Sequence, residues 1–378
     1  MAQTHRRPGR RGGGLTSLRQ FPGRAAVQQR VLPHYRAAFF DNLAVRCDEG
    51  LDLFAGMPRA AESIQTAEAL ASVRWSRGQN VHLLGGRAYF CVQRGLEAWL
   101  AHADPDVLVL EANSRYLSSP RAIAWMERRG RPVLGWGLGA PGRGPLAGWF
   151  RRRFLRRLSG VIAYSTHGAA EYAAAGVPVE RIWVAPNAVE RPPAKPPARS
   201  TPVRRPPRIL FVGRLQRRKR VDSLLTACAS VRPAPEVWIV GDGPDRRRLV
   251  SIAARRFPTA IFAGAVHGDE LRSLLDAADL FVLPGTGGLA LQQALARALP
   301  VIAAEGDGSQ EDMVTPENGW LVPPGRTAPL ADALQSALGN PRRLAAMGQA
   351  SLRLAQTRFS PAVMLDVFVQ ALRAAGEG

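Results

Sequence analysis

Short apolar runs alternate with longer amphipathic stretches along most of this chain. Runs of that kind, bounded by turn residues, are typical of buried parallel strands, and the stretches between them are long enough to form helices. In the first half we expect strands at residues 25–32, 51–56, 81–86, 106–112, 132–138, 160–165 and 181–186. In the second half we expect them at residues 208–213, 236–241, 260–264, 280–285, 300–304 and 319–325. The alternation predicts α/β architecture with parallel sheets.

A segment dense in proline and arginine, residues 191–207, interrupts this alternation. Its composition is typical of a stiff, solvated linker rather than of a core element. We therefore expect two Rossmann-like domains, at residues 25–190 and 208–358, with a ligand cleft between their facing strand ends.

The two ends of the chain are expected to lie outside these domains. Residues 1–24 are basic and lack the apolar core of a secretory signal, which predicts a disordered tail. Residues 359–378 are typical of a final helix, with Ser360 as its N-cap and Pro361 in its first turn. Such a helix could cross back to the first domain.

The charge balance narrows the choice of partners. The formal net charge is +21, from 51 basic and 30 acidic residues, and only Lys195 and Lys219 are lysines. This excess favours nucleotides, phosphorylated sugars, nucleic acid or acidic membranes. Nucleic acid is not expected, because the sequence has no module with interleaved basic and aromatic residues. The cysteines, at positions 47, 91 and 228, show no disulfide or zinc spacing, which fits a cytoplasmic protein.

Two features that follow predicted strands suit a diphosphate. Arg214 and Lys219 follow the strand at 208–213, where an arginine fork and a lysine point charge would lie at the mouth of the cleft. A glycine-rich turn follows the strand at 280–285 and opens a helix at 289–298, so that free backbone N–H groups face a phosphate. The residues of this turn that we assign to diphosphate binding are Thr286, Gly287, Gly288 and Leu289. The alternatives are a solvated basic turn and a glycine turn that serves packing alone.

Two further strand ends are candidates for other parts of a nucleotide ligand. Gly241 and Gly243 in "VGDGP", together with Ala265 after the next strand, form either a nucleotide loop or plain tight turns. Glu305 could bind sugar hydroxyls or could only solvate its loop.

Several of these motifs occur in the order found in one enzyme family. The stretches "FVGRLQRRK", "VWIVGDGP", "LFVLPG" and "ALARALPVI" resemble the donor-binding half of family 4 glycosyltransferases over residues 208–340. The resemblance implies the GT-B fold, in which two Rossmann-like domains face each other across a cleft. It also implies a UDP- or GDP-sugar donor whose diphosphate is held by Arg214 and Lys219, with no cofactor and no metal.

The chain departs from this family at a pair of glutamates, which fall here on Gly285 and Gln293. In the family the second glutamate binds the ribose hydroxyls, and a neutral amide such as Gln293 can also donate to and accept from a diol. The first contacts the transferred sugar, where Gly285 offers only backbone. Because a phosphate turn needs no acid, we expect an altered donor site rather than a dead one.

The first domain should supply the acceptor side and a base for the acceptor hydroxyl. The candidates are His34 and Glu111, although His34 could only cap the next helix and Glu111 could be paired with an arginine. The histidine that the family often carries after the fifth strand is replaced within "GWGLG", so the resemblance implies neither retention nor inversion. Residues 149–158, "WFRRRFLRRL", could dock on an anionic membrane or pack on the sheet with a solvated arginine face.

The sequence therefore predicts a cytoplasmic glycosyltransferase, free or peripheral at the inner face of a membrane. It would move a sugar from a nucleoside-diphosphate donor to a hydroxyl of a glycan, a lipid-linked saccharide or a small molecule, as in polysaccharide biosynthesis. The alternatives are a nucleotide-sugar epimerase of the same fold and a GT-B binding or scaffold protein that has lost catalysis.

Overall fold

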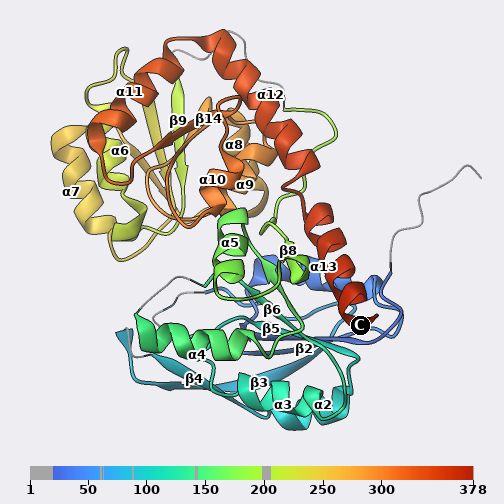
Figure 1. The fold of residues 1–378 in the computed structure, drawn as a ribbon. Helices are drawn as coiled ribbons and strands as arrows, with labels where there is room; N and C mark the ends of the chain where they lie inside the picture. The colour runs from blue at the N-terminus through green and yellow to red at the C-terminus, as the bar shows by residue number, and fades with distance from the viewer. Residues whose placement is uncertain are drawn as a thin grey trace, which may run out of the picture.

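The computed structural model describes residues 20–59, 62, 64–86, 89–140, 144–197 and 206–377, without the side chains of residues 145 and 146. It consists of two α/β domains, one above the other in Figure 1, joined by the segment after β8 and by the last helix. Most of the predicted tail, residues 1–19, and residues 198–205 of the predicted linker lie outside the described residues. Residues 20–24, which were expected to belong to the tail, are described and lie next to β1. Phe21 is 3% exposed and bridges to Cys47, because an apolar ring next to the first strand can be buried in the core.

The first domain is built on an eight-stranded sheet with the order β4-β3-β2-β1-β5-β6-β7-β8. All neighbouring strands are parallel except β3 and β4. The strands are β1 (Ala25–Val31), β2 (Leu51–Gly56), β3 (Arg74–Leu83), β4 (Phe90–Arg94), β5 (Val107–Glu111), β6 (Val133–Gly137), β7 (Gly160–Ala163) and β8 (Ile182–Val184).

Helices cover both faces of this sheet, as a parallel sheet requires. One core layer is formed with α1 (Ala37–Val45), and the other with α2 (Leu96–Ala103), α3 (Ser119–Glu127), α4 (Pro145–Leu155) and α5 (Thr166–Ala174). The strand expected at 81–86 was placed wrongly. It runs from Arg74 to Leu83, so that only residues 81–83 agree, because its first seven residues are mostly polar and half-exposed. The edge strand β4, five residues long, was not predicted.

The second domain has a six-stranded parallel sheet with the order β11-β10-β9-β12-β13-β14. The strands are β9 (Arg208–Val212), β10 (Glu236–Val240), β11 (Ile261–Gly264), β12 (Leu280–Leu283), β13 (Val301–Ala304) and β14 (Gly319–Val322). The helices are α6 (Val221–Cys228), α7 (Arg246–Arg256), α8 (Gly268–Ala277), α9 (Leu289–Ala296), α10 (Ser309–Met313), α11 (Thr327–Leu338) and α12 (Pro341–Thr357). The strand order reverses between β9 and β12, and such a point leaves a crevice at the carboxyl ends of the strands.

The last helix, α13 (Pro361–Gly376), leaves the second domain and packs on the first (Figure 1). Ser360 caps it, with its side chain accepting a hydrogen bond from Val363 N at 3.2 Å. The ring of Phe368 lies 4.9 Å from Phe39 and 4.7 Å from Trp136, measured between centroids. The end of the chain therefore completes the core of the first domain.

Loops that follow strands in the two sheets meet between the domains. Arg214, after β9, donates a hydrogen bond to the backbone carbonyl of Glu62, after β2. Thr166, after β7, donates from its backbone N–H to Asp312, after β13, at 2.7 Å. The carboxyl ends of both sheets thus face one cleft.

Candidate active site

The glycine-rich turn predicted to bind phosphate joins β12 to α9, and Lys219 lies against it. Lys219 comes from a short 3-10 helix, Arg217–Lys219, and its Nζ donates to the backbone carbonyl of Thr286 at 2.6 Å. A Cβ on Gly287 would lie 2.1 Å from this Nζ, and Gly287 has a φ of +137°, which favours glycine. The structure therefore brings together the predicted lysine and the predicted turn at the start of α9.

Burial lowers the pKa of Lys219 below the usual value for a lysine. The Lys219 side chain is 9% exposed, and burial lowers its pKa from 10.5 to about 8. Burial is the largest cause of this lowered pKa, the neighbouring charge of Arg218 contributes to it, and Asp307 opposes it. A bound anion would favour the charged form further, because an opposite charge nearby raises the pKa of an amine.

The two arginines near this lysine have different partners. Arg218 was not predicted as a site residue, but its Nη1 donates to Thr286 Oγ1 at 3.1 Å, on the turn. The only sequence signal for it was its place beside Lys219. Arg214 was predicted at the diphosphate and is half-buried, with its Nη1 reaching the first domain at Glu62.

A second loop, between β13 and α10, supports the turn from the other side. In the amide orientation that satisfies its neighbours, Gln310 accepts from Gly287 N at 3.2 Å and donates to Asp307 at 2.9 Å. Gln310 is fully buried. Sequence reasoning missed it, since nothing in "GDGSQED" shows which residue points inward. Glu305 is exposed, at the rim of this loop.

Positions 285 and 293, where the resemblance to family 4 enzymes implies glutamates, differ in the room they offer for a side chain. A Cβ on Gly285 would lie 2.2 Å from the backbone oxygen of Arg218, so the loop that carries Lys219 packs directly on this glycine. Gln293 is half-buried on α9, and Leu289 and Thr286 are half-buried nearer the helix start. Position 285 therefore holds backbone alone, whereas position 293 keeps an amide.

The candidate nucleotide loop has a packing role. Cβ atoms on Gly241 and Gly243 would lie 2.0 Å from Gly213 O and 2.4 Å from Leu215 O, and both glycines have positive φ. These contacts explain the glycines without a ligand. Ala265 is exposed, directly after β11.

A cavity of about 140 Å³ lies between the domains, next to the turn. Its lining comes from the first domain, the connecting segments and the start of α9. The residues are Leu138, Tyr164, Pro186, Asn187, Gly288, Leu289, Asp307, Ser309, Met313 and Phe359.

Glu111, one of the two candidate bases, is held at the end of β5 in the first domain. Its Oε1 accepts from Arg30 N at 2.7 Å. Burial raises the pKa of the Glu111 carboxyl, and hydrogen bonds from Arg30 N and the Tyr116 hydroxyl oppose the rise. A raised pKa brings a carboxyl closer to the range in which it can exchange protons at neutral pH.

His34, the other candidate, is exposed at the edge of the cleft. It lies in a 3-10 helix, His34–Arg36, and its ring centroid is 6.2 Å from that of His267 in the second domain. The alternative that His34 caps the next helix is wrong, because Arg36 occupies the N-cap position of α1.

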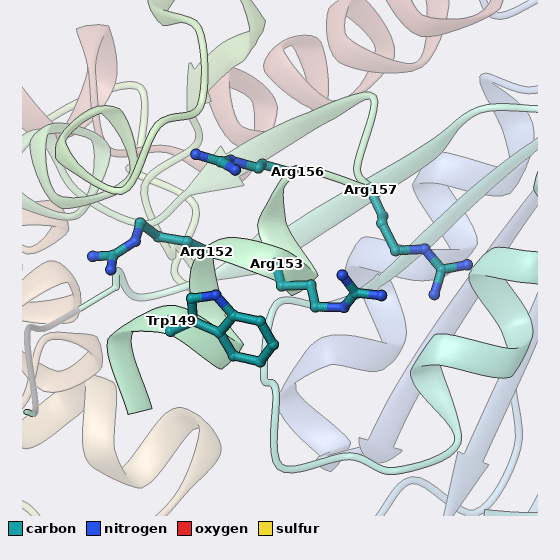
Figure 2. Close-up of a pocket in the computed structure, with 5 residues that line it drawn as sticks. All are labelled: Trp149, Arg152, Arg153, Arg156 and Arg157. Atoms are coloured by element: carbon teal, nitrogen blue, oxygen red, sulfur yellow. The ribbon is translucent and has the colours of Figure 1, made fainter. Parts of the chain in front are cut away.

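Outside the cleft, α4 presents aromatic and basic side chains to solvent. Trp149 and Phe150 are 51% and 62% exposed. Figure 2 shows four arginines around Trp149, and together these side chains line a surface hollow of about 520 Å³; they are Arg152, Arg153, Arg156 and Arg157. The expected apolar stripe of this segment is divided, because Phe154 and Leu158 are buried in the core whereas Phe150 is not. The expectation that this segment packs on the sheet is thus confirmed for Phe154 and Leu158, and docking on a membrane stays a prediction.

With this geometry in place, comparisons with known proteins define the class. The fold is GT-B, two Rossmann-like domains across a cleft, and it is shared with the crystal structure of HepE from Anabaena in complex with UDP. That structure superposes with a TM-score of 0.70 at 16% identity, over 93% of this chain and 99% of HepE.

A family model matches within the second domain. Residues 206–340 match the family described as "Glycosyl transferases group 1". A GDP-mannose-dependent alpha-mannosyltransferase of Mycobacterium tuberculosis (strain CDC 1551 / Oshkosh) is 39% identical over 190 residues, 47% of this chain and 48% of that protein. A GDP-mannose-dependent alpha-(1-6)-phosphatidylinositol monomannoside mannosyltransferase of the same strain is 27% identical over 87% of this chain and 89% of its own length. The chain thus spans about half of the first relative.

Two features are absent from the part of the chain that the structure describes. No group of three or more His, Cys, Asp or Glu side chains is placed to hold a metal ion in this part of the chain. None of the described helices is long and apolar enough to cross a membrane.

Proposed function

We propose that this protein is a family 4-type glycosyltransferase that moves a sugar from a nucleoside-diphosphate donor to a hydroxyl of a glycan or lipid-linked acceptor. The observation that carries the proposal is the contact between Lys219 and the Thr286–Gly287 turn, at the start of α9 and beside the interdomain cavity. A buried cation, flexible glycines and free helix N–H groups together form a site that favours a diphosphate.

The donor would lie along the start of α9. Lys219, Arg218 and the N–H groups of Gly288 and Leu289 hold the diphosphate, and Gln293 binds the ribose in place of the glutamate of family 4. Arg214 is available to the donor once it leaves Glu62. GDP-mannose is the first donor to test, because two relatives that are 39% and 30% identical over part of this chain are named as GDP-mannose-dependent enzymes.

These cations also offset the charge of the leaving nucleoside diphosphate, so we propose that transfer needs no metal. Turnover that is unchanged after treatment with EDTA is the expected result. Loss of turnover that Mg²⁺ or Mn²⁺ restores would contradict this part of the proposal.

The acceptor proton would be taken by Glu111 or His34. The variants Glu111→Gln and His34→Gln separate the two, because only the variant of the true base loses the acidic limb of the pH–rate profile. If Glu111 is the base, activity falls as pH falls through its raised pKa, since the protonated carboxyl cannot accept a proton.

The decisive experiment compares the two lysines of the chain. Purified protein is incubated with labelled GDP-mannose and candidate acceptors, and the products are separated. Lys219→Ala should lower kcat/KM about ten- to a hundredfold, as expected for the loss of one charged transition-state contact. Lys195→Ala, exposed in the linker, is the matched control and should leave the rate unchanged.

Other outcomes select the rival functions. Unchanged turnover in Lys219→Ala would remove the assignment of the site. Conversion of the donor sugar without transfer would indicate an epimerase. Binding of the nucleotide without any turnover would indicate a scaffold protein that kept the fold.

We further propose that the protein is cytoplasmic and docks through α4 on an anionic membrane that holds its acceptor. The exposed Trp149 and Phe150 stand beside arginines, a combination that favours the interface of an acidic bilayer. Leu138, which is 56% exposed, lines the interdomain cavity a few residues before α4. An acceptor in the membrane would therefore lie near the cleft.

Vesicle sedimentation tests this contact. The protein should bind vesicles that contain phosphatidylglycerol and leave pure phosphatidylcholine vesicles in the supernatant. Trp149→Ser with Phe150→Ser should weaken binding about tenfold or more, from the apolar area lost. The control is Val179→Ser, which is 72% exposed outside α4. Equal binding of the double variant and the control would contradict docking through α4.

A further inference from the structure

Gln292, on α9, has the most completely bonded buried side chain near the candidate site. It is fully buried, and its Oε1 accepts from Val189 N at 3.1 Å and from Glu190 N at 3.0 Å. Its Nε2 donates to the backbone carbonyls of Glu190 and Phe359, each at 2.8 Å. Two acceptor positions and two donor hydrogens are the whole capacity of a glutamine amide, and all are used.

These partners belong to the two connections between the domains. Residues 189–190 lie where the chain leaves the first domain, and Phe359 immediately precedes α13, which returns to it. Phe359 is 4% exposed and belongs to the core of the second domain. One side chain therefore fixes both connections to the second domain.

The same residue is linked to the phosphate turn. The backbone N–H of Gln292 donates to the backbone carbonyl of Gly288 at 2.9 Å, so Gln292 lies one helical turn after the start of α9. The interdomain cavity is lined by Gly288 and Leu289 on one side and by Pro186, Asn187 and Phe359 of the connections on the other. A displacement of the helix start is thus transmitted to both connections through a short, bonded path.

We propose that Gln292 is a positioning residue that couples occupancy of the diphosphate site to the relative orientation of the two domains. This inference rests on the proposed function, because the coupling matters only if a donor binds at α9. The chemistry requires an amide. A carboxylate of the same shape cannot donate to Glu190 O and Phe359 O, and an apolar side chain leaves four buried backbone groups unpaired.

The expected kinetic signature is a separation of kcat from KM. Every side-chain partner of Gln292 lies in the connections, so the contacts to the diphosphate remain in its variants. Turnover should fall about tenfold or more while the KM for the donor changes by less than about threefold, the pattern of an interaction made only in the transition state.

Two variants and one control test the coupling. Gln292→Glu keeps the shape and loses the donors, and Gln292→Met keeps the volume and loses all polar atoms. The control is Gln356→Glu, because Gln356 is exposed and donates to Pro193 O at 3.3 Å in the same connection. Small-angle scattering with and without GDP should show compaction in wild type and in the control, and less or none in the Gln292 variants. Equal compaction and equal kcat in all four proteins would overturn the inference.

A measurement on the wild type remains decisive even if both variants fail to fold. Hydrogen exchange at the amides of Val189 and Glu190 should slow when GDP binds, because Gln292 holds both. Unchanged exchange in protein saturated with GDP would overturn the coupling. Absence of GDP binding in the wild type is a different result, since it counts against the proposed donor site itself.

Discussion

Gly285 lies at a position where packing leaves room for backbone alone. Its missing Cβ would overlap the backbone of Arg218, which belongs to the loop that carries Lys219. The loop and the turn are in direct backbone contact, and this contact places Lys219 against Gly287. The packing of this loop on the turn therefore accounts both for the glycine at position 285 and for the burial of Lys219.

A glutamate introduced at position 285 should therefore damage the site. Gly285→Glu is expected to destabilise the protein by about 1–3 kcal/mol, as overpacking does, and to weaken GDP binding. Thermal melts and calorimetric titration measure both effects. Gly148→Glu, where the nearest atom to an added Cβ is 3.6 Å away, is the tolerated control. Tighter donor binding by Gly285→Glu would show that the loop yields easily.

The pH dependence of donor binding should report the lowered pKa of Lys219. The charged amine binds the diphosphate, so affinity for GDP should be constant below pH 8. Above it, affinity should fall by up to about tenfold per pH unit, because binding must then take up a proton. In Lys219→Arg the fall should disappear, since arginine stays charged. A wild-type affinity that stays flat to pH 10 would contradict a buried, perturbed lysine.

The lowered pKa of Lys219 also makes the folding stability depend on pH. A lysine whose pKa is lowered in the folded protein binds fewer protons there than in the unfolded chain between pH 8 and pH 10.5. The free energy of unfolding contributed by Lys219 therefore rises with pH across this window. The site keeps a charge at a cost in stability, as functional sites often do.

At the residue scale, the sequence could identify a site residue only where its type stood out from the rest of the chain. Lys219 was recognisable because lysine is rare in a chain rich in arginine, and the turn because of its glycines. Gln292 and Gln310 gave no such signal. Their roles come from hydrogen bonds to residues far away in the sequence or in another loop, which no local pattern contains.

At the scale of elements, strands that coincide with an apolar run were predictable, whereas the half-exposed pair β3 and β4 at one side of the first sheet was not. Apolar runs gave β1, β2 and β5 to within a residue or two, because a parallel strand is buried on both faces. The pair β3 and β4 is half-exposed and polar, so its strands lack that signal.

The last helix carries a stability prediction at this scale. Phe368 is fully buried against Phe39 and Trp136, so Phe368→Ala should cost about 3–5 kcal/mol of unfolding free energy. Denaturant titration followed by tryptophan fluorescence measures this, because Trp136 lies in the affected core. Gln370→Ala, exposed on the same helix, should change stability by less than about 0.5 kcal/mol. Similar midpoints for the two variants would mean that α13 is dispensable to the first domain.

At the scale of the whole molecule, the domains are joined by contacts of two kinds. The connections and α13 hold them together permanently, whereas polar contacts across the cleft can break and re-form. The alternation of apolar runs and helical stretches predicted the α/β architecture with two mainly parallel sheets. It could not predict the contacts across the cleft, because these depend on the orientation of one domain against the other.

The contact between Asp312 and α5 is the clearest of these, and it should bias the cleft towards closure. The Asp312 carboxylate of the second domain accepts hydrogen bonds from Thr166 N and Thr166 Oγ1, so it caps a helix of the first domain. A carboxylate at a helix N-terminus is favourable by about 0.3–1 kcal/mol, and charged hydrogen bonds add to this. Asp312→Ala should therefore shift the donor-free protein towards open conformations by roughly tenfold in population.

Small-angle scattering should show a larger radius of gyration for this variant than for wild type or for Asp332→Ala, which is exposed within the second domain. The difference should shrink when GDP is added, because a bound donor supplies its own contacts between the domains. An Asp312→Ala protein as compact as wild type without nucleotide would place the energy of closure in the connections, with Gln292, rather than in the cleft.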